Sequence, residues 1–133
     1  METGVANNYA QPQATILLVE DFDDTRLIMK LWLMRKGYRV IEAENGEEAV
    51  DLAHTQAPDL IIMDLMMPGL SGLDATRRIR EYQSLQQTPI VAVSAYGADQ
   101  YRARAIDAGC DEYVSTPFEP EELGQLIKTL LAR

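Results

Sequence analysis

Three acidic side chains follow two apolar segments of the chain, in positions suited to metal and phosphoryl chemistry. Glu20 and Asp21 come directly after the apolar run at 15–19, and Asp64 comes directly after the run at 60–63. Carboxylates crowded together repel one another, and a divalent cation that prefers oxygen ligands, such as Mg²⁺, relieves that repulsion. An aspartate beside bound Mg²⁺ can attack a phosphoryl group and form an aspartyl phosphate whose charge the metal partly neutralises. Asp64 is the best placed candidate for that nucleophile.

Hydroxyl side chains follow two further apolar runs. Ser94 comes directly after the run at 90–93, and Ser115 and Thr116 close a short run that begins at Tyr113. If these runs are parallel strands, their carboxyl ends gather along one edge of a sheet, where such sheets bind their ligands. The sequence therefore predicts one crevice that holds three carboxylates and two or three hydroxyl groups.

The segments that must position these residues have the pattern of alternating strands and helices. The apolar runs are hydrophobic on both faces and rich in β-branched residues, as buried strands are. Strands are expected at residues 15–19, 38–43, 60–63, 90–93 and 113–115, and helices begin near residues 23, 46, 72, 99 and 120. Connections with room for one helix each favour a parallel sheet covered on both faces. The predicted fold class is α/β, a doubly wound five-stranded parallel sheet in a single domain.

The first expected helix has recognisable ends. Asp23 or Asp24 can cap its N-terminus, and capping by itself explains why these acids stand there. Gly37 suits the position just past its C-terminus. Between these ends, four apolar side chains recur at the spacing of an amphipathic helix: Leu27, Ile28, Leu31 and Met34.

Length and charge narrow the classes of function. The chain has 133 residues and a mass of 14.9 kDa, the size of one ordinary domain. Residues 1–13 are polar and contain Pro12, which predicts a flexible tail before a domain at 14–133. The formal net charge of −9 repels phosphate backbones and anionic lipids, so we expect no direct contact with nucleic acid or membrane. Three arginines of the third expected helix are accordingly interpreted as a solvated face: Arg77, Arg78 and Arg80.

Targeting signals and cysteine chemistry set further limits. No stretch approaches the roughly 20 apolar residues of a membrane span, and the N-terminus lacks the basic and apolar regions of a signal peptide. We therefore expect a cytoplasmic protein. Cys110 is the single cysteine and His54 the single histidine, so an internal disulfide and a Cys/His zinc site are both excluded.

Four motifs, in order along the chain, resemble those of the CheY-like receiver domain of two-component response regulators. They lie at 16–21 (ILLVED), 64–72 (DLMMPGLSG), 94–95 (SA), and 109–113 (GCDEY) with a following Pro-Phe at 117–118. The resemblance covers about residues 14–132 and implies the (βα)5 flavodoxin-like fold. It also implies a signalling protein of a phosphorelay that is not an enzyme, beyond catalysing its own phosphorylation and dephosphorylation.

The resemblance implies a role for each member of the acidic group. Asp64 would accept a phosphoryl group from a histidine kinase or a phosphotransfer protein. Asp21, Asp64 and the backbone carbonyl of Met66 would ligate Mg²⁺ directly, and Glu20 would act through a water molecule.

The resemblance also implies a switch that a protein partner reads. Ser94 would hydrogen-bond the phosphoryl oxygen, and Tyr113 would swing inward as Ser94 is drawn toward the phosphate. Met66 and Tyr96 stand two residues beyond Asp64 and Ser94, where side chains of the family overhang the phosphate. A bulky apolar residue and an aromatic residue there should obstruct an attacking water, so we expect slow autodephosphorylation.

One position departs from the family pattern. Thr116 occupies the place of the lysine that immediately precedes the Pro-Phe pair in the family. Threonine offers a neutral hydroxyl where lysine brings a charge, and one lost charge-assisted hydrogen bond corresponds to about 1.5–3 kcal/mol. This departure keeps an alternative open: an atypical receiver-like interaction module whose phosphorylation is impaired or uncoupled.

A second alternative comes from the residues that follow the first strand. Asp21, Asp23 and Thr25 fit the D-x-D-x-T pattern of haloacid-dehalogenase-type (HAD-type) phosphatases, in which the first aspartate, here Asp21, is the nucleophile. That family usually needs a longer chain, a lysine and further acids at later strand ends. The pattern also leaves the Asp64 loop without a role.

The resemblance indicates where a downstream protein would bind. In the family, both partners and dimers usually form through the surface made by the helix from about 99, the strand at 113–115 and the helix from 120. We expect a stand-alone receiver domain that is a monomer or a weak dimer and signals through such a protein partner.

Overall fold

The structure is a computed structural model that describes residues 13–95 and 99–133. Its centre is a five-stranded parallel sheet in the order β2-β1-β3-β4-β5. The strands are β1 (Thr15–Val19), β2 (Arg39–Ala43), β3 (Leu60–Asp64), β4 (Ile90–Ser94) and β5 (Glu112–Ser115). The predicted doubly wound α/β fold is confirmed. Residues 1–12 of the expected flexible tail lie outside the described part of the chain.

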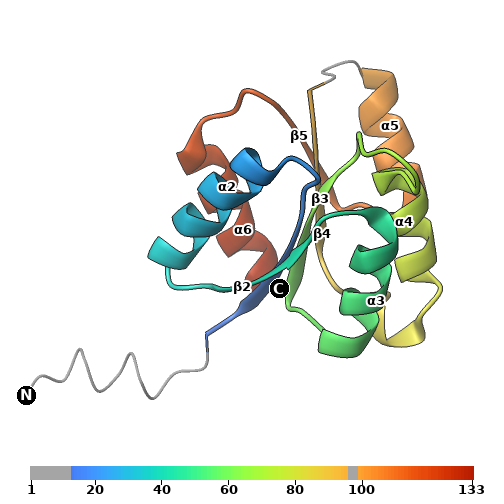
Figure 1. The fold of residues 1–133 in the computed structure, drawn as a ribbon, viewed down its shortest axis with the longest axis horizontal. Coiled ribbons are helices and arrows are strands. Elements are labelled where there is room, and N and C mark those ends of the chain that lie inside the picture. The colour runs from blue at the N-terminus through green and yellow to red at the C-terminus, as the bar shows by residue number, and fades with distance from the viewer. Residues whose placement is uncertain (1–12, 96–98) are drawn as a thin grey trace, which may run out of the picture.

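Helices cover both faces of this sheet (Figure 1). They are α2 (Asp23–Arg35), α3 (Gly46–Gln56), α4 (Gly72–Arg80), α5 (Asp99–Ala108) and α6 (Pro120–Leu131), with a short 3₁₀ helix at Gln83–Leu85 that the sequence did not predict. One face packs against α2 and α6, and the other packs against α3, α4 and α5. No helix of the described residues is long and apolar enough to span a membrane.

The core consists of two apolar layers on either side of the sheet. Along β1, Ile16 and Leu18 join the layer beneath α2 and α6, whereas Leu17 and Val19 join the layer beneath α3, α4 and α5. All four side chains are at most 1% exposed. A strand buried on both faces explains why these runs are apolar throughout instead of alternating with polar residues.

The start of α2 differs from the prediction. Its N-cap is Phe22, which has extended backbone angles and no side-chain cap, so the prediction that Asp23 or Asp24 caps the helix was wrong. The Phe22 N–H donates to the Glu20 carboxylate at 3.1 Å, so the residue before the helix is held by the end of β1. Asp23 and Asp24 lie instead in the first turn, where negative charge interacts favourably with the helix dipole.

The predicted apolar stripe of α2 does not face the sheet. Leu33 is fully buried there, with Met29 and Trp32 partly buried against the same layer. Positions 29, 32 and 33 also have helical spacing, so two apolar stripes run along one helix and the sheet covers one of them. The other stripe is exposed: Leu27, Ile28, Leu31 and Met34.

Candidate functional site

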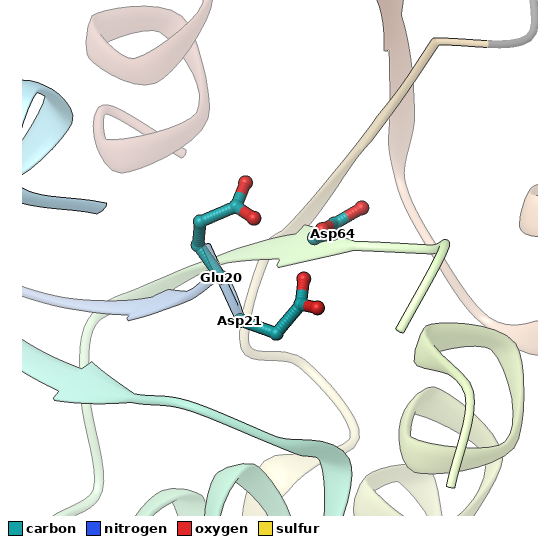
Figure 2. A group of neighbouring side chains, drawn as sticks. All are labelled: Glu20, Asp21 and Asp64. Atoms are coloured by element: carbon teal, nitrogen blue, oxygen red, sulfur yellow. The ribbon is translucent and has the colours of Figure 1, made fainter. Parts of the chain in front are cut away.

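Adjacent strands bring the three predicted carboxylates together. β1 and β3 pair in parallel up to Val19 and Met63, so Glu20, Asp21 and Asp64 emerge side by side at the carboxyl edge of the sheet. One oxygen of each carboxylate lies within 4.8 Å of the others, and Figure 2 shows the three side chains grouped above the strand ends. We call Glu20, Asp21 and Asp64 the acidic triad.

Backbone hydrogen bonds hold two members of the acidic triad in place. The N–H of Met66 donates to Asp64 Oδ1 at 3.0 Å, and the N–H of Phe22 donates to Glu20 Oε2 at 3.1 Å. Both donors stand two residues after their acceptors, so each carboxylate is fixed by the turn that follows its own strand. The local backbone thus orients both side chains toward the common edge of the sheet.

Burial and neighbouring negative charge make two members of the acidic triad, Glu20 and Asp64, hard to ionise. Burial, with a smaller contribution from the Asp64 charge, raises the pKa of Glu20 to about 7. The pKa of Asp64 is also raised, first by burial and further by the charge of Asp21, although the Met66 N–H opposes this. None of the ion pairs among the described residues includes a member of the triad. Half-buried oxygens with excess negative charge fit a hard cation such as Mg²⁺.

Arg26 supports the same edge from α2, a role that the sequence did not indicate. Its guanidinium donates to the backbone carbonyl of Glu20 at 2.9 Å and forms ion pairs with Asp23 and with Glu42 on β2. The Arg26 side chain is 12% exposed. Because two other carboxylates take up its charge, Arg26 steadies the end of β1 without neutralising the acidic triad.

Two glycines allow the loop after Asp64 to pack closely. A Cβ atom at Gly72 would collide with the backbone carbonyl of Asp64, and a Cβ atom at Gly46 would collide with the carbonyl of Leu70. The Gly72 N–H also donates to the carbonyl of Leu65 at 3.3 Å. The first turn of α4 thus rests directly on the end of β3, which no local sequence pattern reveals.

Two of the three predicted hydroxyl residues, Ser94 and Thr116, lie on neighbouring strand ends at the same edge. Ser94, the last residue of β4, is 2% exposed, and Thr116 follows β5 in a half-buried position. The Thr116 N–H donates to the Ser94 carbonyl at 2.8 Å, which ties the two strand ends together. β4 in turn pairs with β3, with Val93 opposite Asp64.

The other predicted site residues have different environments. Tyr113 is 5% exposed, and the Arg102 guanidinium lies 5.6 Å from the centre of its ring. Met66 is 46% exposed beside Asp64. Tyr96 lies outside the described residues.

Comparison with known proteins identifies the family. The family model of the response regulator receiver domain matches residues 16–128 of this chain. The chain belongs to this family. Receiver domains are signalling modules of two-component systems, and they bind Mg²⁺ in an acidic active-site cleft. Family membership leaves the phosphatase pattern at Asp21 and Asp23 without support, and the acidic triad includes Asp64 and not Asp23.

Curated relatives carry a receiver domain as part of a longer chain. The transcriptional regulatory protein ResD of Bacillus subtilis is 39% identical over 121 residues, which are 91% of this chain and 49% of ResD. The transcriptional regulatory protein SrrA of Staphylococcus aureus is 36% identical over 118 residues, 89% of this chain and 48% of SrrA. The chain thus spans about half the length of these relatives.

Solved receiver domains share the whole fold. The receiver domain of a sensor histidine kinase from Pseudomonas aeruginosa PAO1 has a TM-score of 0.86 and 33% identity, covering 92% of this chain and 100% of its own. That structure has a magnesium ion coordinated in the active-site cleft. The chemotaxis protein CheY4 of Vibrio cholerae has a TM-score of 0.85 and 26% identity, covering 90% of this chain and 99% of its own.

Proposed function

We propose that this receiver domain, at residues 14–133 behind a flexible tail at 1–13, accepts a phosphoryl group on Asp64 in an Mg²⁺-dependent reaction. The observation that carries this proposal is the acidic triad, with three carboxylate oxygens within 4.8 Å at the ligand-binding edge of a parallel sheet. The donor is a phosphohistidine of a histidine kinase or a phosphotransfer protein. The Asp64 carboxylate oxygen forms the new bond to phosphorus as the phosphorus–nitrogen bond breaks, and the histidine nitrogen keeps that electron pair.

The cation is held by residues around Asp64. Asp21, Asp64 and the backbone carbonyl of Met66 would hold it, and Glu20 would act through a water molecule. A bound Mg²⁺ supplies positive charge that offsets the negative charge of the carboxylates and the incoming phosphoryl group. The Met66 N–H meanwhile fixes the orientation of Asp64 through its bond to Oδ1.

The signal passes from Asp64 to Ser94 and Tyr113. Ser94 ends the strand next to Asp64, and the hydroxyl binds a phosphoryl oxygen. Tyr113 lies on β5 opposite Ala92, two residues before Ser94, so a shift of the β4 end changes the packing of the tyrosine ring. A groove of about 650 Å³ next to Tyr113, between α5, β5 and α6, supports this face as the surface that a downstream protein reads in the cytoplasm.

A second candidate function is a phosphorylation-independent interaction module, and Thr116 is the observation that favours it. The residue stands at the edge of the site with a neutral side chain, and its backbone already joins Ser94. Without a cation at this position, phosphorylation of Asp64 is less strongly coupled to the Ser94 end of β4.

Intact-mass spectrometry separates the two functions. The protein is incubated with Mg²⁺ and a small acyl-phosphate donor, beside an Asp64→Asn variant and a sample treated with a chelator. We expect one added phosphoryl group in the parent with Mg²⁺ and none in the other two samples. No addition in the parent, with Mg²⁺ binding shown by titration calorimetry, would overturn the phosphoacceptor function and favour the interaction module.

A further inference from the structure

The outer surface of α2 is unusually apolar for a solvent-facing helix. Leu27, Ile28, Leu31 and Met34 are 52%, 68%, 55% and 50% exposed. They are half of the eight large hydrophobic side chains that are exposed among the described residues, and they lie together on one helix. Single exposed hydrophobic residues are ordinary, but a contiguous group marks a surface that another element covers.

The spacing on this surface is that of a helix-packing seam. Leu27, Leu31 and Met34 follow one another at intervals of four and three residues, and Ile28 lies beside them, one turn from Leu31. This spacing places the apolar side chains in one row along the helix, as in helices that pack side by side in coiled coils. The apolar layer between α2 and the sheet contains Leu33, Met29 and Trp32 and none of these four side chains, although Ile28 borders a small apolar pocket with Phe118 and Leu123.

Two oppositely charged side chains lie at the two ends of the same apolar strip. At 3.6 residues per turn, Asp24 and Arg35 fall on the same side of α2 as Leu31, one in the first turn and the other in the last. Both are exposed, and neither has an ion-pair partner within residues 13–95 and 99–133. We call these two residues with Leu27, Ile28, Leu31 and Met34 the outer stripe of α2.

We propose that the outer stripe binds the outer stripe of a second copy of this chain, with the two α2 helices antiparallel. An antiparallel pair places Asp24 of each helix opposite Arg35 of the other and Ile28 opposite Leu31, so one stripe complements itself under two-fold symmetry. A parallel pair would place like charges together at both ends. In an antiparallel pair, the positive end of each helix dipole also lies beside the negative end of the other, which is favourable.

The dimer is weak and does not depend on phosphorylation. One helix face is smaller than the roughly 800 Å² per partner of a stable interface, and the net charge of −9 on each copy opposes association. The stripe lies outside the acidic triad, so an Asp64→Asn protein dimerises as the parent does. Failure of phosphorylation would therefore leave this inference standing, and failure of dimerisation would leave the proposed function standing.

Sedimentation equilibrium of the full chain at physiological ionic strength tests the contact. We expect the average mass of the parent to rise with concentration from 14.9 kDa toward twice that value. Leu31→Glu should keep the protein at the monomer mass, because each substituted side chain would enter the centre of the seam. The matched control is Ile106→Glu, since Ile106 is 46% exposed on α5, away from the stripe, and should leave the association unchanged. Circular dichroism should show native helix content in both variants.

Charge exchange tests the antiparallel arrangement. Asp24→Lys and Arg35→Glu should each weaken association, because both ends of either homodimer then carry like charges. An equimolar mixture of the two variants should associate more strongly than either alone, since every helix end again faces the opposite charge.

Three results would overturn the inference. In the first, the average mass of the parent stays at 14.9 kDa up to about millimolar concentration. In the second, Ile106→Glu loses as much association as Leu31→Glu. In the third, the mixture of Asp24→Lys and Arg35→Glu associates no more strongly than either variant alone. Dimerisation that requires deletion of residues 1–12 would also count against it, because the chain's own N-terminal segment would then be the occupant of the stripe. A parent that remains monomeric leaves a different protein as the partner of this surface.

Discussion

At the scale of single residues, Glu20 combines a proposed metal-binding role with a stability cost. Its pKa is about 7 in the fold, against an ordinary value of 4.5, mainly because the side chain is buried. A carboxyl whose pKa is raised by folding holds its proton more tightly in the folded state. Its stabilising contribution is therefore complete below pH 4.5 and is lost as the pH rises through about 7.

We therefore expect the metal-free protein to lose stability between about pH 4.5 and 7, and a Glu20→Gln variant to lose less. Saturating Mg²⁺ should remove this loss, and a hundredfold excess over Kd adds about 2.7 kcal/mol. Thermal unfolding with chelator or Mg²⁺ across this pH range is the measurement. Glu42→Gln is the control, because hydrogen bonds from Lys30 and Arg26 lower the pKa of Glu42, so this group titrates below pH 4.5 and the loss between pH 4.5 and 7 should remain. A parent with the same pH profile as Glu20→Gln would contradict the expectation.

Thr116 is the residue at which the switch is expected to be weak. A Thr116→Lys variant should restore a charge beside the phosphoryl group, worth about 1.5–3 kcal/mol, or ten- to a hundredfold in the population of the phosphorylated active state. Amide NMR of Ser94 and Tyr113 with and without a phosphodonor measures that population. Thr116→Gln adds length without charge and should behave like the parent. Equal shifts in the lysine and glutamine variants would mean that charge is not what the switch lacks.

Met66 is expected to control how long the phosphoryl group stays on Asp64. Its side chain is 46% exposed beside the acceptor, so Met66→Ala should open a path for water without disturbing the core. We expect the phosphorylated parent to hydrolyse slowly and the alanine variant to hydrolyse several-fold faster, as followed by intact mass over time. A half-life of only seconds for the parent would refute this obstruction.

At the scale of elements, the contact between α4 and β3 sets the position of Asp64. Gly72 begins α4 where any Cβ would strike the Asp64 carbonyl and crowd Leu65. The backbones of the two elements thus meet directly, and the Gly72 N–H bond to the Leu65 carbonyl ties the loop after Asp64 to the helix.

Gly72→Ala should therefore weaken Mg²⁺ binding at least tenfold and lower stability by about 1–3 kcal/mol, the usual range for overpacking. Gly124→Ala is the matched control. Gly124 lies inside α6, and a Cβ atom there would meet the Trp32 side chain of α2 no closer than 3.6 Å, which is an ordinary contact distance. Alanine there should raise stability by about 0.5–1 kcal/mol through helix propensity and leave Mg²⁺ affinity unchanged. Isothermal titration with Mg²⁺ and denaturant unfolding measure both effects, and normal Mg²⁺ affinity in Gly72→Ala would show that the loop adapts.

At the scale of the whole molecule, the candidate metal site and a stabilising hydrogen-bond network lie at opposite edges of the sheet. The acidic triad lies at the carboxyl edge, whereas Arg80 joins two connections at the amino edge, the one before β4 and the one before β5. Its guanidinium donates to the carbonyls of Gly109, Leu85 and Thr88 and forms an ion pair with Asp111 at 3.0 Å. Removing it leaves several buried acceptors without their donor.

Arg80→Ala should accordingly lower the free energy of unfolding by on the order of 2 kcal/mol while Mg²⁺ affinity of the folded protein stays the same. Arg77→Ala on the same helix is the control, because the Arg77 side chain is 50% exposed and, among the residues that the structure describes, pairs only with Asp74 three residues away. An unchanged midpoint in urea for Arg80→Ala would show that water replaces the lost bonds.

Much of this molecule follows from sequence alone, because the features concerned are local. Strand and helix patterns come from the spacing of apolar side chains, and five parallel strands leave their carboxyl ends on one edge, which brings Glu20, Asp21 and Asp64 together. The family resemblance at 16–21 and 64–72 depends on equally local runs of residues. These inferences needed no knowledge of how distant segments pack.

Only the tertiary structure decided the features that depend on distant neighbours. Periodicity alone could not tell which stripe of α2 the sheet covers, and the stripe with Leu31 proved to be the exposed one. Arg80, interpreted from sequence as part of a solvated face, is 17% exposed, because its partners come from chain segments up to 31 residues away. The raised pKa of Glu20 has the same origin, since burial is a property of the assembled molecule and not of the residues beside it in the chain.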